Sequence, residues 1–196
     1  MLESTGDPKT GIQIASRTPL PGFLPQPLLK TVVALGNLLK GSEEKWAIGG
    51  DAGEIVQGVT VTADHVEILT TKKGCEAMST ILSQYQTLHP RETEKTLGRD
   101  AIVQGVPYPA YVKSEYAEFL MDGVKVQVYG DLRIKVGEGD WSDPLDFEAT
   151  KVNVVGKSLP VVPLELSNRV YTYLGLNWVD RVQKISEAVK RSRVGM

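Results

Sequence analysis

The sequence predicts an α/β domain, in which a mixed β-sheet is flanked by helices and followed by a short helical extension at the C-terminus. Two observations predict this fold class. Between residues 28 and 136 the apolar residues change repeatedly between helical spacing and the alternation typical of strands. From residue 161 onward the spacing is helical again, with one interruption at Gly175. The length of 196 residues suits one domain, or one domain with a small appended element.

The composition excludes several classes of protein. The net charge is −2, so no overall basic field would attract nucleic acid or an anionic membrane. The single cysteine, Cys75, rules out an internal disulfide framework. No apolar run approaches the roughly 20 residues that span a bilayer, and the N-terminus lacks the pattern of a secretory signal. We therefore expect a cytoplasmic protein with no membrane partner.

The N-terminal residues predict an extended arm that precedes the folded domain. Four prolines between residues 19 and 27 recur too densely for a helix. We therefore expect a Pro-rich arm over residues 1–26 and one domain over residues 27–196. The domain begins with a predicted helix that ends at Gly41, and its apolar face consists of Leu28, Leu29, Val32, Val33, Gly36 and Leu39.

The next segments predict an alternation of strands and helices. A short apolar strand at residues 46–48 runs into two glycines, and residues 51–57 form a short helix. Residues 59–70 read as extended. A second amphipathic helix follows, and the polar residues 89–98 are expected to form a loop. The apolar face of this second helix consists of Cys75, Met78, Leu82 and Tyr85.

The second half predicts strands and then helices. After a hairpin turn at residues 121–123, the segments 124–128 and 132–136 alternate apolar and polar residues, as strands with one buried face do. A helix is expected to end at Gly175, and Asn177 is the expected N-cap of the last helix. The inward stripe of that helix is predicted to be Val179, Val182, Ile185 and Val189.

Several of these segments resemble the signature of the nucleotidyltransferase superfamily. The run Trp46-Ala47-Ile48-Gly49-Gly50 precedes a short helix and then Asp64-His65-Val66-Glu67-Ile68. The family pairs a Gly-Gly or Gly-Ser turn with Asp-x-Asp on the next strand. Residues 123–128 are similar to its strand with a third carboxylate, and residues 159–165 look like part of the tail of small prokaryotic members. The resemblance implies a nucleotidyltransferase-like fold and transfer of a nucleoside monophosphate from an NTP to a hydroxyl acceptor.

The resemblance also implies a site for Mg²⁺ or another divalent cation. Side chains at i and i+2 of a strand project from the same face, and the matching pair here is His65 and Glu67. The third position corresponds to Gln127, and Asp64 would reach a metal only from the turn before the strand. Magnesium prefers carboxylate ligands, whereas histidine favours softer metals. One anionic ligand of three remains, which predicts weakened or lost catalysis.

The residues expected to bind phosphate are altered as well. Gly49 and Gly50 allow backbone N–H groups to approach a triphosphate at the start of a helix. Asp51 in the same turn is expected to cap this helix and to repel a phosphate. Lys72 and Lys73 either neutralise phosphate charge or form a solvated pair at a helix start.

Other chemically notable residues favour packing roles. Cys75 lies on the apolar face of its helix, which favours core packing over nucleophilic catalysis. Tyr108, Tyr111 and Tyr116 lie near Lys113, where they either stack on nucleic-acid bases or pack, and packing is favoured.

Two functions are compatible with these residues. In the first, the protein is an enzyme in which Asp64, His65 and Glu67 hold one metal and take part in catalysis, while Gly49 and Gly50 cradle the phosphates of an NTP. A nucleic-acid or protein acceptor has no support in the sequence. In the second, the protein is a non-catalytic binding or assembly module that retains the fold. A homo-oligomer is compatible with both, and the site chemistry favours the second narrowly.

Overall fold

The computed structural model describes residues 23–97, 100–175 and 178–194. Most of the predicted arm and Asn177 therefore lie outside the described residues. The helices are α1 (Gln26–Leu38), α2 (Gly50–Ile55), α3 (Lys72–Ile81), the 3₁₀ helix η1 (Ser83–Tyr85), α4 (Leu164–Leu174) and α5 (Val179–Val194). The strands are β1 (Trp46–Gly49), β2 (Val66–Thr70), β3 (Gln86–Thr96), β4 (Ala101–Val103), β5 (Val106–Tyr108), β6 (Ala110–Met121), β7 (Val124–Val136), β8 (Thr150–Val154) and β9 (Lys157–Val161).

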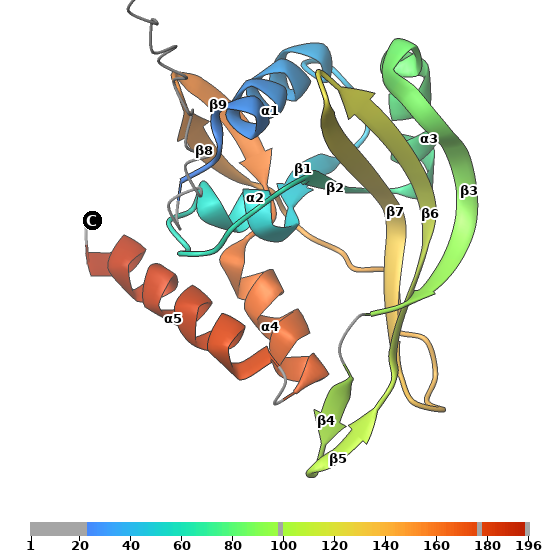
Figure 1. The fold of residues 1–196 in the computed structure, drawn as a ribbon, viewed down its shortest axis with the longest axis vertical. Helices are drawn as coiled ribbons and strands as arrows, with labels where there is room; N and C mark the ends of the chain where they lie inside the picture. Colours follow the sequence, from blue (N-terminus) through green and yellow to red (C-terminus); the bar gives the residue numbers. More distant parts are fainter. Residues whose placement is uncertain (1–22, 98–99, 176–177, 195–196) are drawn as a thin grey trace, which may run out of the picture.

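The predicted mixed sheet with flanking helices is confirmed (Figure 1). Seven strands form one sheet in the order β3-β6-β7-β2-β1-β9-β8. The pairs β2–β7 and β1–β9 are parallel and the other pairs are antiparallel. Strands β4 and β5 form a separate hairpin, which protrudes at one end of the molecule (Figure 1).

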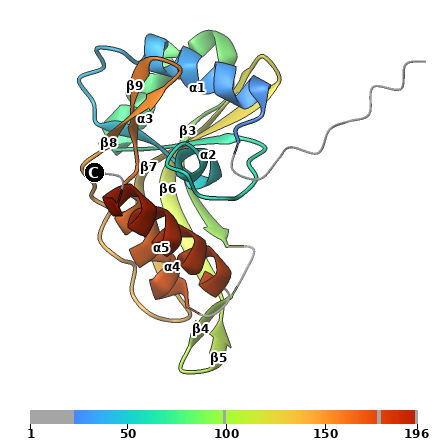
Figure 2. The ribbon, with the colours of Figure 1, turned by 90° about the vertical axis from the view of Figure 1, so that its left-hand side faces the viewer.

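The two faces of the sheet have different chemistry because side chains alternate along each strand. Val66, Ile68, Val126 and Val128 point into the main hydrophobic core, which α1 and α3 cover. Residues between them, such as Glu67, point to the opposite face. That face is partly covered by α4, and α5 lies beside α4 in both views (Figures 1 and 2).

Helix α1 shows how the prolines are accommodated. Pro25 is its N-cap and Pro27 lies in its first turn, where the missing N–H has no intrahelical acceptor to lose. Gly36 allows α1 to approach β9 closely, since a Cβ at this position would lie 2.1 Å from a methyl carbon of Leu159.

Two predictions about the strands were wrong, and one hairpin was not predicted. Residues 86–96 form strand β3 rather than a loop, and the polar composition reflects its position at the edge of the sheet. The extended stretch predicted over residues 59–70 is a strand only from Val66. The β8–β9 hairpin was not predicted, because its turn places the β-branched Val155 at a φ of 50°, a conformation that such residues rarely adopt.

The C-terminal helices follow the prediction with one difference. Helix α4 ends at Gly175, which has a φ of 84°. In α5, Ile185 is fully buried, but Val179 is 50% exposed and does not belong to the inward stripe. Within the described residues, no helix is both long and apolar enough to cross a membrane.

Candidate functional site

The motif residues from three strands lie side by side on one face of the sheet. Gly49 on β1 pairs with Glu67 on β2, and Glu67 pairs with Gln127 on β7. Because these residues are in register on neighbouring strands, their side chains project from the same face. The structure therefore brings together the positions that the sequence motif links, although their roles in catalysis stay predictions.

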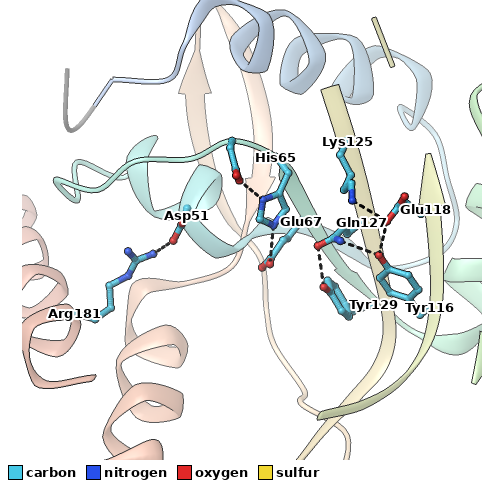
Figure 3. Close-up of polar contacts among 10 residues, drawn as sticks. Asp51, His65, Glu67, Tyr116, Glu118, Lys125, Gln127, Tyr129 and Arg181 are labelled. Carbon is cyan, nitrogen blue, oxygen red and sulfur yellow. Dashed lines mark hydrogen bonds and ion pairs between the residues drawn. The ribbon is translucent and has the colours of Figure 1, made fainter. Parts of the chain in front are cut away.

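His65 lies between two carboxylates in this arrangement (Figure 3). Its Nδ1 is 2.5 Å from Oδ1 of Asp64, and its Nε2 is 3.2 Å from Oε1 of Glu67. A neutral imidazole has one N–H donor, whereas an imidazolium has two. Two carboxylate acceptors on opposite sides of the ring therefore favour the protonated, positively charged form.

The hydrogen bonds shift the pKa values of His65 and Asp64 in the expected directions. The hydrogen bond that His65 donates to Glu67, aided by the one it donates to Asp64, raises the pKa of His65 from 6.5 to about 9, although partial burial opposes the rise. The same ion pair lowers the pKa of Asp64, chiefly through its hydrogen bond with His65. At neutral pH an imidazolium occupies the position where the family signature has its first metal-binding aspartate.

Gln127 is held in a chain of hydrogen bonds across β6 and β7 (Figure 3). Its Oε1 accepts from the hydroxyl of Tyr129 at 3.0 Å, and its Nε2 donates to the hydroxyl of Tyr116 at 2.8 Å. Tyr116 in turn donates to Glu118 at 2.8 Å, and Lys125 lies 3.5 Å from the same carboxylate. The amide oxygen of Gln127, its best metal ligand, thus has a partner within the protein.

The glycine turn is in contact with the carboxylate of Glu67. Gly50 has a φ of 54°, and a Cβ at this position would lie 2.1 Å from Oε2 of Glu67. Only glycine combines this left-handed backbone with such a close approach. The carboxylate therefore lies against the turn that was predicted to cradle phosphates.

A second charged cluster secures the helix that follows the turn. Arg181 on α5 pairs with Asp51, and its Nε lies 2.6 Å from Oε2 of Glu54, without the alignment of a hydrogen bond. Glu54 is 2% exposed, and burial raises its pKa to about 7 although the Arg181 charge lowers it. Burial lowers the pKa of Arg181, but the nearby Glu54, Tyr171 and Asp51 raise it by more, so the net shift is upward. The pair anchors α5 to α2.

Lys72 and Lys73 lie at the other end of β2. Glu67 and Gly49 face each other at one end of the β1–β2 pair, whereas the lysines follow Thr70 at the opposite end. Lys72 is 3.2 Å from Glu115. The structure does not bring these lysines to the glycine turn, and their role in nucleotide binding stays a prediction.

A cavity of about 340 Å³ adjoins the glycine turn. Gly49, Gly50, Asp51 and Glu67 line one end of it. Mostly apolar side chains from the sheet, from α4 and from nearby loops line the rest, together with the polar groups of Ser167, Tyr171 and Trp178. Gln127 does not contribute to its lining. The polar end thus combines the turn with two carboxylates that are already paired.

The donor set does not fit the two magnesium ions that the resemblance implies. Among the described residues, no group of three or more His, Cys, Asp or Glu side chains could hold a metal. Of the three signature positions, His65 is cationic, Glu67 is paired with it, and Gln127 is neutral. Magnesium requires several hard oxygen ligands, usually carboxylates, and these three residues do not supply that set.

Comparison with known proteins identifies the family. The profile of the aminoglycoside-2''-adenylyltransferases matches residues 31–185, which is most of the chain. The chain belongs to the aminoglycoside-2''-adenylyltransferase family. The nucleotidyltransferase superfamily predicted from the sequence is thereby confirmed. A search of curated proteins found no match.

Comparison with solved structures found several that are similar to this adenylyltransferase-family chain. A Thermotoga maritima protein of the nucleotidyltransferase type has a TM-score of 0.65 and 22% identity, over 86% of this chain and 96% of that one. A lincosamide antibiotic adenylyltransferase bound to lincomycin has a TM-score of 0.48 and 9% identity, over 84% and 98%. ANT(2'')-Ia in complex with adenylyl-2''-tobramycin has a TM-score of 0.47 and 8% identity, over 85% and 92%.

The sequence interpretation missed several polar residues of this site. Glu118 pairs with Gln127 across the β6–β7 hairpin, and counting back from the predicted turn at residues 121–123 would have found it. Glu54 and Arg181 are 127 residues apart and carry no sequence signal of their contact. Tyr171 lines the cavity, and burial raises its pKa.

The ion pair of His65 predicts a pH-dependent stability. His65 binds its proton more tightly in the folded chain, where its pKa is about 9 instead of 6.5. The stabilisation is therefore complete below pH 6.5 and is lost as the pH rises through 9. We expect the free energy of unfolding to fall by about 1–2 kcal/mol over this interval, less than the full shift because Asp64 is solvent-exposed and screened.

Urea unfolding of His65→Asn beside the parent chain measures this contribution. The difference in stability between the two should shrink as the pH rises from about 6.5 to about 10. His89→Asn, which removes the exposed histidine of β3, is the matched control and should keep the slope of the parent chain. A constant difference across this interval would show that folding does not raise the pKa of His65.

Proposed function

We propose that this member of the aminoglycoside-2''-adenylyltransferase family is a ligand-binding protein that retains the fold without metal-dependent nucleotidyl transfer. The observation that carries the proposal is the position of His65 between Asp64 and Glu67. Its imidazolium neutralises Glu67, the one carboxylate that remains at the three signature positions. A divalent cation that approached Glu67 would meet a positive charge in place of a ligand.

The phosphate side of the site supports the same proposal. The only guanidinium in contact with the α2 turn among the described residues is that of Arg181, and Asp51 and Glu54 already pair with it. The carboxylate of Glu67 lies against Gly50, where it would repel a phosphate oxygen. Nucleotide phosphates would therefore find neither metal ions nor a free cation at the turn.

Incubation with each of the four NTPs and Mg²⁺ or Mn²⁺ tests this proposal. We expect no release of pyrophosphate above the rate without protein, and no increase in melting temperature with Mg²⁺-ATP relative to EDTA. NTP consumption that needs the metal, is lost in Glu67→Ala and is kept in the control Glu94→Ala would instead establish an enzyme with Glu67 in its predicted role.

A further inference from the structure

The cavity beside the glycine turn is a partly open pocket between the sheet and a helix. Its volume of about 340 Å³ lies in the range of small-molecule pockets. Val112 on β6 and Leu132 and Ile134 on β7 form one wall, and Leu166 and Val170 on α4 form the opposite wall. A sheet face and a helix thus enclose the space between them.

The cavity lies between two hydrophobic clusters that do not fully meet. Leu69 and Leu166 belong to one cluster, and Ile134 and Leu174 belong to the other, yet all four line the cavity. An apolar occupant would contact both clusters and remove their facing surfaces from water. This burial is favourable in proportion to its apolar area.

The charges of the site disfavour a charged occupant. Among the described residues that line the cavity, none is Lys, Arg or His. The two carboxylates at its polar end are paired, Asp51 with Arg181 and Glu67 with His65. A phosphate or carboxylate ligand would find no counter-ion, and a buried charge without a partner is costly.

We infer that this cavity binds an uncharged, mostly apolar small molecule with a polar group that faces the Gly49–Gly50 turn. This inference rests on the proposed function, because a metal–nucleotide complex would compete for the same turn. The apolar walls supply the binding energy, and the backbone of the turn orients the polar group.

Titration of the full chain with the uncharged fluorescent probe N-phenyl-1-naphthylamine, in buffer with EDTA, tests the inference. We expect saturable binding of one probe per chain. Leu132→Trp fills the cavity and should weaken binding by about tenfold or more. Leu120→Trp makes the same change at an exposed position of β6 and should bind as the parent chain does. Val170→Phe provides a second obstruction, from the helix side, should Leu132→Trp fail to fold.

The outcomes separate this inference from the proposed function. The inference would be overturned if the probe does not bind saturably, or if Leu132→Trp and Val170→Phe, where they fold, bind it as the parent chain does. Either result would leave the proposed function standing. Addition of Mg²⁺-ATP to the probe complex should leave the fluorescence unchanged. Displacement of the probe by Mg²⁺-ATP, and not by Mg²⁺ alone, would show that the cavity accepts a charged ligand. This result would overturn the inference and contradict the proposed function as well.

Discussion

Replacement of Arg181 with methionine is expected to lower the free energy of unfolding by about 3–5 kcal/mol at pH 8. The guanidinium is the cation next to Glu54, whose carboxylate is 2% exposed and 2.6 Å from the Arg181 Nε. Methionine would retain much of the apolar packing but leave a buried carboxylate without a counter-charge. Chemical denaturation followed by circular dichroism measures the loss.

The loss of stability in Arg181→Met should be larger at pH 8 than at pH 5. Burial raises the pKa of Glu54 to about 7 even beside Arg181, and removal of the cation raises it further. The folded variant therefore holds Glu54 protonated at pH 5, where the missing charge costs less than at pH 8. A loss that is the same at both pH values would contradict the burial of an ionised Glu54.

Two matched variants isolate the ion pair. Lys184→Met removes an exposed cation from the same helix, and we expect it to change stability by less than about 0.5 kcal/mol. Glu54→Gln in the Arg181→Met background removes the uncompensated charge and should recover most of the loss. Failure of this rescue would show that Arg181 stabilises the fold by packing alone.

The double substitution His65→Asp and Gln127→Asp is expected to create a response to divalent cations that the parent chain lacks. The new carboxylates, at residue 65 directly before β2 and at residue 127 on β7, join Glu67 on β2 and restore the anionic set of the family signature. Without metal, like-charge repulsion should lower the melting temperature. Saturation with Mg²⁺ at about one hundred times its dissociation constant should stabilise the variant by about 2.7 kcal/mol.

A charge-matched control shows whether the position of the new carboxylates matters. His89→Asp with Gln84→Asp makes the same substitutions at exposed positions away from the site, and we expect no response to Mg²⁺. A parent chain that Mg²⁺ stabilises as strongly as the double variant would contradict the account, as would a double variant that does not respond.

The sequence predicted the parts of the fold that depend on local pattern. The alternation of Val124, Val126 and Val128 predicted a half-buried strand, and the family resemblance implied that Glu67 and Gln127 would share one site. The replacement of a carboxylate by His65 predicted an altered site, since histidine and carboxylates prefer different metals. The contacts of His65 with Asp64 and Glu67 became apparent only in the structure.

The features that were missed depend on distant parts of the chain. Strand β3 is polar because it is an edge, and its pairing with β6 cannot be read from its own residues. The contact between Glu54 and Arg181 joins α2 to α5 and has no local signal. The cavity arises from the packing of α4 against the sheet, so no segment of the sequence specifies it alone.

An NMR titration of the two histidine rings tests the central claim most directly. His89 lies exposed on β3 and serves as an internal reference for His65. The account predicts that His65 stays protonated at both ring nitrogens at neutral pH, titrates near 9, and is not broadened by Mn²⁺ with ATP. Titration of His65 near 6.5 together with selective broadening by Mn²⁺ would show that this position holds a metal.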